Sequence, residues 1–246
     1  MRGKKKTLFE VDSPAYFEKF SSGKVSFFIK EAYKTARTNI LFSTKSKDES
    51  KKVLFTSPEP AEGKSTTCIS LAISFCQMNA KVLLIDADLR KPTVHKKLKL
   101  RNDVGLSTVL SNFNEVSEAI KKTEHGFECI TAGPIPPNPA ELLSSEDFDE
   151  LLKNLGKEYD YIFIDSPPIN LVSDACIISK FVTGTILVVR DNYTRFPSVD
   201  RAIKSLEFVD AKILGLILND VNDIADENSY KYKYKRYGYG YGYKDI

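Results

Sequence analysis

The run Val53-Leu54-Phe55-Thr56, followed directly by Ser57-Pro58-Glu59-Pro60-Ala61-Glu62-Gly63-Lys64-Ser65-Thr66, decides the fold class of this chain. Its first part is short and continuously apolar, as in a strand buried on both faces, and residues 65–78 have the pattern of a helix. A loop between such a strand and helix wraps phosphates with backbone N–H groups and points the helix N-terminus at them. The stretch therefore predicts a P-loop, although Pro58 stands where the general pattern has its first glycine.

The loop assigns roles to individual residues. Lys64 is predicted to reach the β- and γ-phosphates as a catalytic residue, and the Ser65 hydroxyl to ligate Mg²⁺. Asn219, which ends the last predicted strand, is the candidate for an adenine contact, and a cap of that turn is its alternative role. The predicted nucleotide-binding residues of the loop are Ala61, Glu62, Gly63, Lys64, Ser65 and Thr66.

Further apolar runs alternate with helical patterns along the chain. The other predicted strands are residues 82–85, 161–164, 185–189 and 213–218, and the predicted helices are 26–42, 65–78, 145–155, 173–181 and 199–208. This alternation is typical of a doubly wound α/β fold, with a mostly parallel sheet and helices on both faces. Ligands of such sheets bind outside the carboxyl ends of the strands.

Two of these strands end in acidic residues. Leu84-Ile85 precedes Asp86-Ala87-Asp88, and Phe163-Ile164 precedes Asp165. Mg²⁺ keeps several waters, so one hydroxyl, the phosphates and one or two carboxylates suffice as ligands. Asp88 and Asp165 are therefore predicted to bind Mg²⁺ together with Ser65, and Asp86 to accept a proton from the attacking hydroxyl. The alternative is that these acids only terminate strands and cap helices.

The composition bounds the domain organisation. With 246 residues of which 42% are hydrophobic, the chain has room for one large core with flexible ends. We predict a flexible basic segment at 1–25, a core domain at 26–228 that begins with the helix at 26–42, and a disordered tail at 229–246. The four cysteines show no C-x-x-C spacing and are interpreted as reduced. No run of about 18 apolar residues occurs, so we expect a cytoplasmic protein unless a partner tethers it.

The tail is the repetitive part of the sequence. Its charge from residue 230 onward is +4, within a total of +3, and each phosphate would add about −1.5 to −2. Phosphorylation would therefore reverse its charge, whereas the alternative is that the aromatic and basic residues stack on single-stranded nucleic acid, a partner we do not expect. The predicted phosphorylation sites are Tyr230, Tyr232, Tyr234, Tyr237, Tyr239, Tyr241 and Tyr243.

Four segments together resemble the bacterial tyrosine kinases of capsule and exopolysaccharide operons. They are residues 62–66 (Walker A), 84–92 (Walker A′), 164–168 (Walker B) and the stretch Gly133-Pro134-Ile135-Pro136-Pro137-Asn138-Pro139-Ala140-Glu141-Leu142-Leu143. The resemblance implies a P-loop NTPase fold of the MinD and ParA kind, ATP and Mg²⁺ as cofactors, and phosphorylation of the tyrosine cluster in trans. It also implies regulation of polysaccharide synthesis and export, a membrane polysaccharide co-polymerase as activating partner and membrane anchor, and a cognate protein-tyrosine phosphatase.

The same resemblance implies a ring of identical subunits. Members of the family carry Glu-x-x-Arg-x-x-Arg on an N-terminal helix that packs against the neighbouring subunit, and the match here is Glu31, Lys34 and Arg37. Lys34 departs from the pattern, because lysine cannot reproduce a bidentate guanidinium contact. The alternative interpretation of Glu31 and Lys34 is a solvated i,i+3 pair.

Two other functions would use the same nucleotide site. Partition and septum-positioning ATPases of this P-loop group carry an extra lysine five residues before the loop lysine, where this chain has Glu59. A switch that senses ATP through its oligomeric state would need Lys64 and the aspartates but no tyrosine cluster. The tail and Glu59 therefore favour the kinase.

Overall fold

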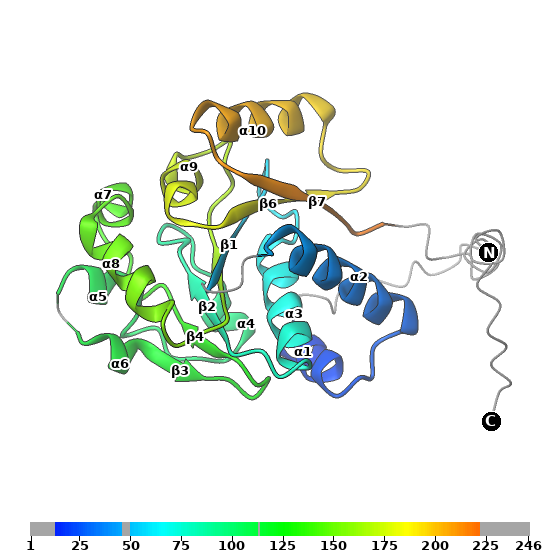
Figure 1. Ribbon diagram of the computed structural model, residues 1–246, viewed down its shortest axis with the longest axis horizontal. Helices are drawn as coiled ribbons and strands as arrows, with labels where there is room; N and C mark the ends of the chain where they lie inside the picture. The colour runs from blue at the N-terminus through cyan, green and yellow to red at the C-terminus, as the bar shows by residue number, and fades with distance from the viewer. Residues whose placement is uncertain (1–12, 46–49, 113, 222–246) are drawn as a thin grey trace, which may run out of the picture.

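The computed structural model describes residues 13–45, 50–112 and 114–221 (Figure 1). Its centre is a seven-stranded sheet in the order β3-β4-β2-β5-β1-β6-β7. All neighbouring strands are parallel except β3 and β4, which pair antiparallel. The strands are β1 (Lys51–Thr56), β2 (Val82–Asp86), β3 (Ile120–Lys122), β4 (Glu128–Ile130), β5 (Tyr161–Asp165), β6 (Gly184–Arg190) and β7 (Ile213–Asn219). The five strands predicted from apolar runs are thus confirmed, in a mostly parallel sheet.

Helices cover both faces of this sheet. They are α1 (Pro14–Ser21), α2 (Phe27–Ser43), α3 (Lys64–Cys76), α4 (Val94–Lys97), α5 (Leu106–Leu110), α6 (Val116–Ala119), α7 (Pro139–Leu143), α8 (Glu146–Leu155), α9 (Asp174–Ile178) and α10 (Phe196–Phe208), with a 3₁₀ turn at Ser179–Phe181. Side chains of β1 alternate between two cores, with Val53 and Phe55 in one and Leu54 in the other. This burial on both faces explains why the strand is continuously apolar.

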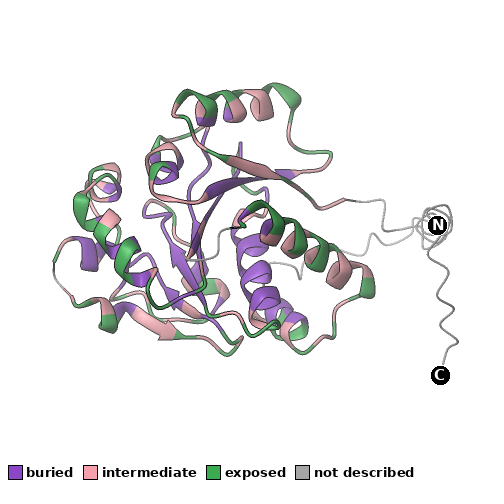
Figure 2. Ribbon diagram, viewed as in Figure 1, coloured by how far each residue is buried: buried purple, intermediate pink, exposed green. Residues whose placement is uncertain are grey.

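The helix that follows the P-loop is the central helix of its layer. Figure 2 shows α3 buried along nearly its whole length, between the sheet and the pair α1 and α2. Among the described residues, no helix combines the length and the apolar composition needed to cross a membrane.

The N-terminal boundary predicted from the sequence is wrong. Residues 14–21, assigned to a flexible segment, form α1, in which Tyr16, Phe17 and Phe20 are buried against α3. The Ser13 hydroxyl accepts from the Tyr16 N–H at 3.3 Å, and Pro14 occupies the first helical position. These are ordinary helix start signals, which the neighbouring basic residues obscured. Residues 1–12 and the tail at 229–246 lie outside the described residues.

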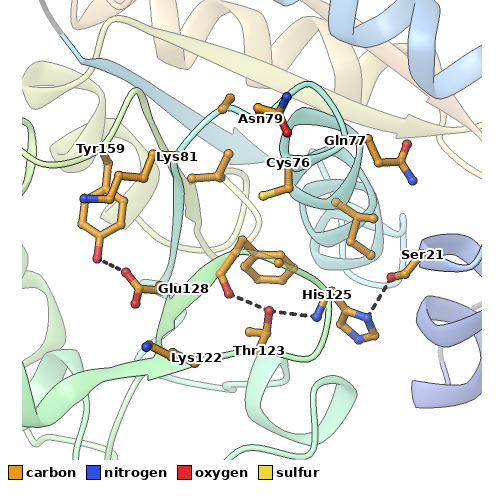
Figure 3. Close-up of a pocket in the computed structure, with 15 residues that line it drawn as sticks. Ser21, Cys76, Gln77, Asn79, Lys81, Lys122, Thr123, His125, Glu128 and Tyr159 are labelled. Atoms are coloured by element: carbon orange, nitrogen blue, oxygen red, sulfur yellow. Dashed lines mark hydrogen bonds between the residues drawn. The ribbon is translucent and has the colours of Figure 1, made fainter.

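The β3–β4 hairpin, whose strands have only three residues each, is also absent from the sequence predictions. This hairpin and α1 face each other across a hollow of about 680 Å³ at the end of α3 (Figure 3). Ser21 Oγ lies 2.8 Å from His125 Nδ1 and donates to the Phe17 carbonyl, so we assign the proton of the Ser21–His125 bond to the imidazole. Burial lowers the pKa of His125, which favours the neutral ring. The Ser21–His125 hydrogen bond therefore connects α1 to the β3–β4 hairpin.

Candidate active site

The P-loop, the loop after β2 and the loop after β5 surround a cavity of about 350 Å³ at the carboxyl ends of their strands. Residues 60–66 form one wall, and Asp88, Arg90, Lys91, Thr93 and Lys97 form another. Pro167, Pro168, Leu171 and Val172 supply the third. The structure thus brings the three predicted motifs together at the edge of the sheet where α/β proteins bind ligands.

The P-loop backbone depends on Gly63. This residue has φ +85° at the N-cap of α3, and a Cβ built on it would lie 2.0 Å from Asn219 Nδ2. Asn219 Nδ2 donates to the Glu62 carbonyl at 2.9 Å. The predicted adenine residue is therefore packed against the P-loop, where it fixes the backbone next to a position that only glycine can occupy.

Side chains from beyond β6 also hold the P-loop in place. The Glu62 side chain is buried, accepts from the Glu59 N–H at 3.1 Å, and accepts from the Thr194 hydroxyl. Burial raises the pKa of Glu62. Glu59 accepts from the Ser198 hydroxyl at 2.9 Å, so it connects the loop to α10. Glu59, which stands where the partition ATPases carry a lysine, thus makes a structural contact that its position in the sequence did not reveal.

Lys64 stands at the centre of the three motifs. Its Nζ lies 3.3 Å from Asp165 Oδ1, 3.4 Å from Asp88 Oδ2 and 3.3 Å from Ser65 Oγ. Burial alone would lower the pKa of Lys64, but Asp165, Asp88 and Asp86 outweigh it and the pKa is raised. The ammonium is therefore held charged at the base of the cavity.

The two acids at the end of β2 have different surroundings, because Asp86 is the last residue of the strand and Asp88 lies in the loop that follows. Asp86 is fully buried, is not part of the cavity wall, and accepts from the Asp88 N–H and the Val94 N–H at 3.2 Å each. Burial, with the charge of Asp165 added, raises the pKa of Asp86 well above its usual range. Asp88 does line the cavity. The structure thus places Asp88 in the cavity wall, but not the predicted proton acceptor Asp86, whose oxygens accept hydrogen bonds from the loop.

The residues present fit a nucleotide with a divalent cation. Asp165 is fully buried, and its Oδ2 has no hydrogen-bond partner among the described residues. Ser65 lines the cavity. The part of the chain that the structure describes contains no group of three His, Cys, Asp or Glu side chains that could hold a metal ion. A cation here would therefore depend on the Ser65 hydroxyl, the Asp165 oxygen and the nucleotide's own oxygens, because Mg²⁺ commonly needs only a few protein ligands.

An ion pair that the sequence predictions missed joins two walls of the cavity. Arg90 donates to Asp174 through Nε at 2.8 Å and Nη2 at 2.9 Å, and Asp174 is fully buried at the start of α9. Arg90 belongs to the Walker A′ stretch, so its motif was visible, but nothing in the spacing indicated its partner 84 residues away. The pair fixes the loop after β2 against the segment that follows β5.

The residues predicted for oligomer contacts lie on α2, away from this cavity. Lys34 Nζ and Glu31 Oε1 are 2.7 Å apart in a partly exposed i,i+3 pair. Arg37 Nη1 donates to the Ser74 carbonyl at 2.5 Å and to the Ser74 hydroxyl at 3.2 Å, so its guanidinium contacts α3 of the same chain. The predicted phosphorylation sites lie outside the described residues.

Comparison with known proteins decides between the functions that share this site. A family model described as "AAA domain" matches residues 60–193. The tyrosine-protein kinase YwqD of Bacillus subtilis is 44% identical over 190 residues, which cover 77% of this chain and 80% of that protein. The chain belongs to the bacterial tyrosine kinases. The kinase domain of the Escherichia coli tyrosine kinase ETK is 32% identical, covers 87% of this kinase and is itself covered to 80%, with a TM-score of 0.77. The chimerical protein CapA2B2 is 37% identical, with a TM-score of 0.73 and coverage of 77% and 83%.

The main alternative is less similar to this kinase. The septum site-determining protein MinD of Pyrococcus horikoshii, solved with Mg-ADP, is 23% identical over 72% of each chain, with a TM-score of 0.60. That similarity shows the shared P-loop NTPase fold alone. The tyrosine kinase is thus favoured over the partition ATPase.

Proposed function

We propose that the kinase transfers the γ-phosphate of ATP to tyrosines of its own C-terminal cluster, in trans, and thereby regulates capsular or exopolysaccharide synthesis and export. The observation that carries the proposal is the position of Lys64, within 3.4 Å of both Asp88 and Asp165 at the base of a cavity walled by the P-loop. A tyrosine cluster in the same sequence supplies the acceptor.

The reaction needs little covalent chemistry from the protein. The tyrosine oxygen bonds to the γ-phosphorus, the bond from that phosphorus to the β–γ bridging oxygen breaks, and ADP leaves. Lys64 and the N–H groups of residues 61–66 stabilise the charge on the phosphates. We assign the phenolic proton to Asp88 rather than to Asp86, because Asp88 is the acid at the cavity wall.

Ser65 and the unpartnered oxygen of Asp165 are the groups we propose to hold Mg²⁺. The ion would neutralise phosphate charge during transfer. Asn219 serves in this proposal to hold the P-loop, with the adenine nearby.

The partners are proposals as well. The similarity to the chimerical protein CapA2B2 supports a polysaccharide co-polymerase as a membrane partner that holds the kinase at the inner face of the membrane. A tyrosine phosphatase would reverse the modification. In a ring of subunits, Glu31 and Lys34 are the members of the predicted interface that could reach a neighbour, since the Arg37 guanidinium is bonded to Ser74.

The test is the intact mass of the full chain after incubation with Mg-ATP, beside a Lys64→Met variant. We expect phosphate increments on the parent protein and none on the variant, because removing the ammonium removes the cation from the transition state. Formation of ADP without any phosphorylated protein would support the partition ATPase or the switch instead.

A further inference from the structure

A groove on the kinase surface meets the catalytic cavity. It lies between the segment at residues 169–176 and α10, with a volume of about 880 Å³. Two contacts join the walls of the groove. Asn170 Nδ2 donates to the Ser198 carbonyl at 2.9 Å, and Cys176 Sγ contacts the Ser205 carbonyl at 3.7 Å. The groove therefore follows α10 over at least two turns.

The groove and the catalytic cavity share a wall. Leu171 and Val172 line both of them. A segment that lay in the groove would pass over these two side chains to the place where the γ-phosphate is expected. This continuity separates the groove from the hollow beside α1, which shares no residue with the cavity.

The walls of the groove expose large apolar side chains. Phe208 is 88% exposed and Leu171 is 59% exposed, and Pro197 lies at the other end of the same helix. Apolar side chains gathered on a concave surface are typical of a binding site rather than of solvated surface.

The tyrosine-rich segment of the chain has the pattern that this groove requires. In an extended peptide alternate residues lie on one face, so Tyr239, Tyr241 and Tyr243 share a face and the intervening glycines share the other. From Pro197 to Val209, which follows its last residue, α10 spans about 18 Å at 1.5 Å per residue. That length holds about five or six extended residues, which matches the repeat at residues 238–243.

We propose that the groove between residues 169–176 and α10 binds the tyrosine-bearing segment in extended form, with its tyrosine face on Leu171 and Phe208 and one tyrosine directed into the cavity. The proposal rests on the proposed function, because it names where the acceptor of that reaction lies. The charged residues of the groove are Asp200, Arg201 and Lys204, and Lys204 pairs with Asp200 at 2.7 Å. The repeat at residues 238–243 has no charged side chain, so the affinity comes from apolar contact and depends little on salt.

The experiment uses a synthetic peptide of residues 237–246 as acceptor. The enzyme is the full chain with its seven tail tyrosines replaced by serine, so that its own tail does not compete. Phe208→Ser is compared with Phe42→Ser, a matched control whose side chain is 62% exposed on α2. Both residues are on the surface, so neither substitution is expected to affect folding.

We expect Phe208→Ser to raise the KM for the peptide about five- to tenfold, the effect of losing one aromatic contact, with kcat unchanged. Phe42→Ser should leave the KM unchanged. Equal KM values in Phe208→Ser and the parent enzyme would overturn the groove proposal. No phosphate on this peptide, together with none on the natural tail, would instead refute the proposed function.

Discussion

At the scale of single residues, Gly63 makes the most specific prediction. Gly63→Ala combines a left-handed backbone, at φ +85°, with a collision against Asn219 Nδ2 at 2.0 Å. We expect at least a tenfold loss of nucleotide affinity, because the backbone N–H groups of the loop must shift. Gly23→Ala is the control, since Gly23 also has a positive φ but its nearest neighbour is the Lys30 ammonium at 3.6 Å.

Asn219→Gly in the Gly63→Ala background should restore part of the affinity, because it removes the atom that collides. Calorimetric titration with a non-hydrolysable ATP analogue measures all four proteins. Unchanged affinity in Gly63→Ala would contradict the conformation described for the P-loop.

The raised pKa of Asp86 leads us to predict that the stability of the folded protein depends on pH. Its pKa in the folded protein is raised well above the ordinary value of 3.8, so the folded state binds the proton more tightly than the unfolded state. The contribution of Asp86 is therefore most favourable below about pH 3.8 and is lost as the pH rises toward the raised value.

We expect Asp86→Asn to flatten the curve of melting temperature against pH above about pH 3.8. The substitution also changes the hydrogen bonds that the Asp88 and Val94 N–H groups donate. This shifts the melting temperature by an amount that does not depend on pH. If the curves of melting temperature against pH run parallel for the parent and Asp86→Asn, burial does not raise the pKa of the Asp86 carboxyl group.

The sequence predicted which residues meet at the site better than it predicted what each does there. Lys64, Ser65, Asp88 and Asp165 come together because they lie at or after the carboxyl ends of β1, β2 and β5, which are neighbours in one sheet. Asp86 ends β2 and accepts from two N–H groups of the loop that follows, whereas Asp88 lies in that loop, whose path the spacing of the residues does not reveal.

At the scale of elements, the Arg90–Asp174 pair connects the loop after β2 to α9. Arg90→Lys keeps the charge but loses the two parallel hydrogen bonds, so we expect the rate of phosphoryl transfer to fall about tenfold. Arg101→Lys is the matched control, because Arg101 and Asp103 form a similar pair, at 2.8 Å, that is largely exposed.

Single-turnover phosphorylation and the melting temperature would be measured for both variants. A loss of rate in Arg90→Lys at nearly unchanged melting temperature marks a positioning role. A fall in melting temperature without a change in rate would assign the pair to stability alone.

The helix α1 is a structural element of the domain, contrary to the sequence prediction. Phe17 is fully buried in α1, so Phe17→Ala should lower the free energy of unfolding by about 3–5 kcal/mol. Phe27→Ala, at a side chain 66% exposed on α2, should change it by less than about 0.5 kcal/mol. Urea unfolding measures both, and equal values would mean that α1 does not pack as described.

The elements missed from the sequence are the short ones. α1 has eight residues and β3 and β4 have three each, so their periodicity extends over too few positions to be recognised. The longer strands of a parallel sheet can be recognised as continuous apolar runs, because both of their faces are buried.

At the scale of the whole molecule, the fold alone does not distinguish a kinase from a septum-positioning ATPase, since both share the sheet and the P-loop. In the function that we propose, the distinction lies in the acceptor, the tyrosine cluster at residues 230–243. The central claim is therefore that one subunit phosphorylates these tyrosines in another.

Mixing two variants tests this claim most directly. One is a full chain with an intact site and all seven tail tyrosines replaced by phenylalanine, and the other is Lys64→Met with its natural tail. After incubation with Mg-ATP, phosphotyrosine is mapped by mass spectrometry on the Lys64→Met chain, beside the same chain incubated alone. We predict phosphate on residues 230–243 of that chain in the mixture and none when it is alone. An unmodified tail in the mixture, under conditions in which the parent protein is phosphorylated, would contradict transfer in trans.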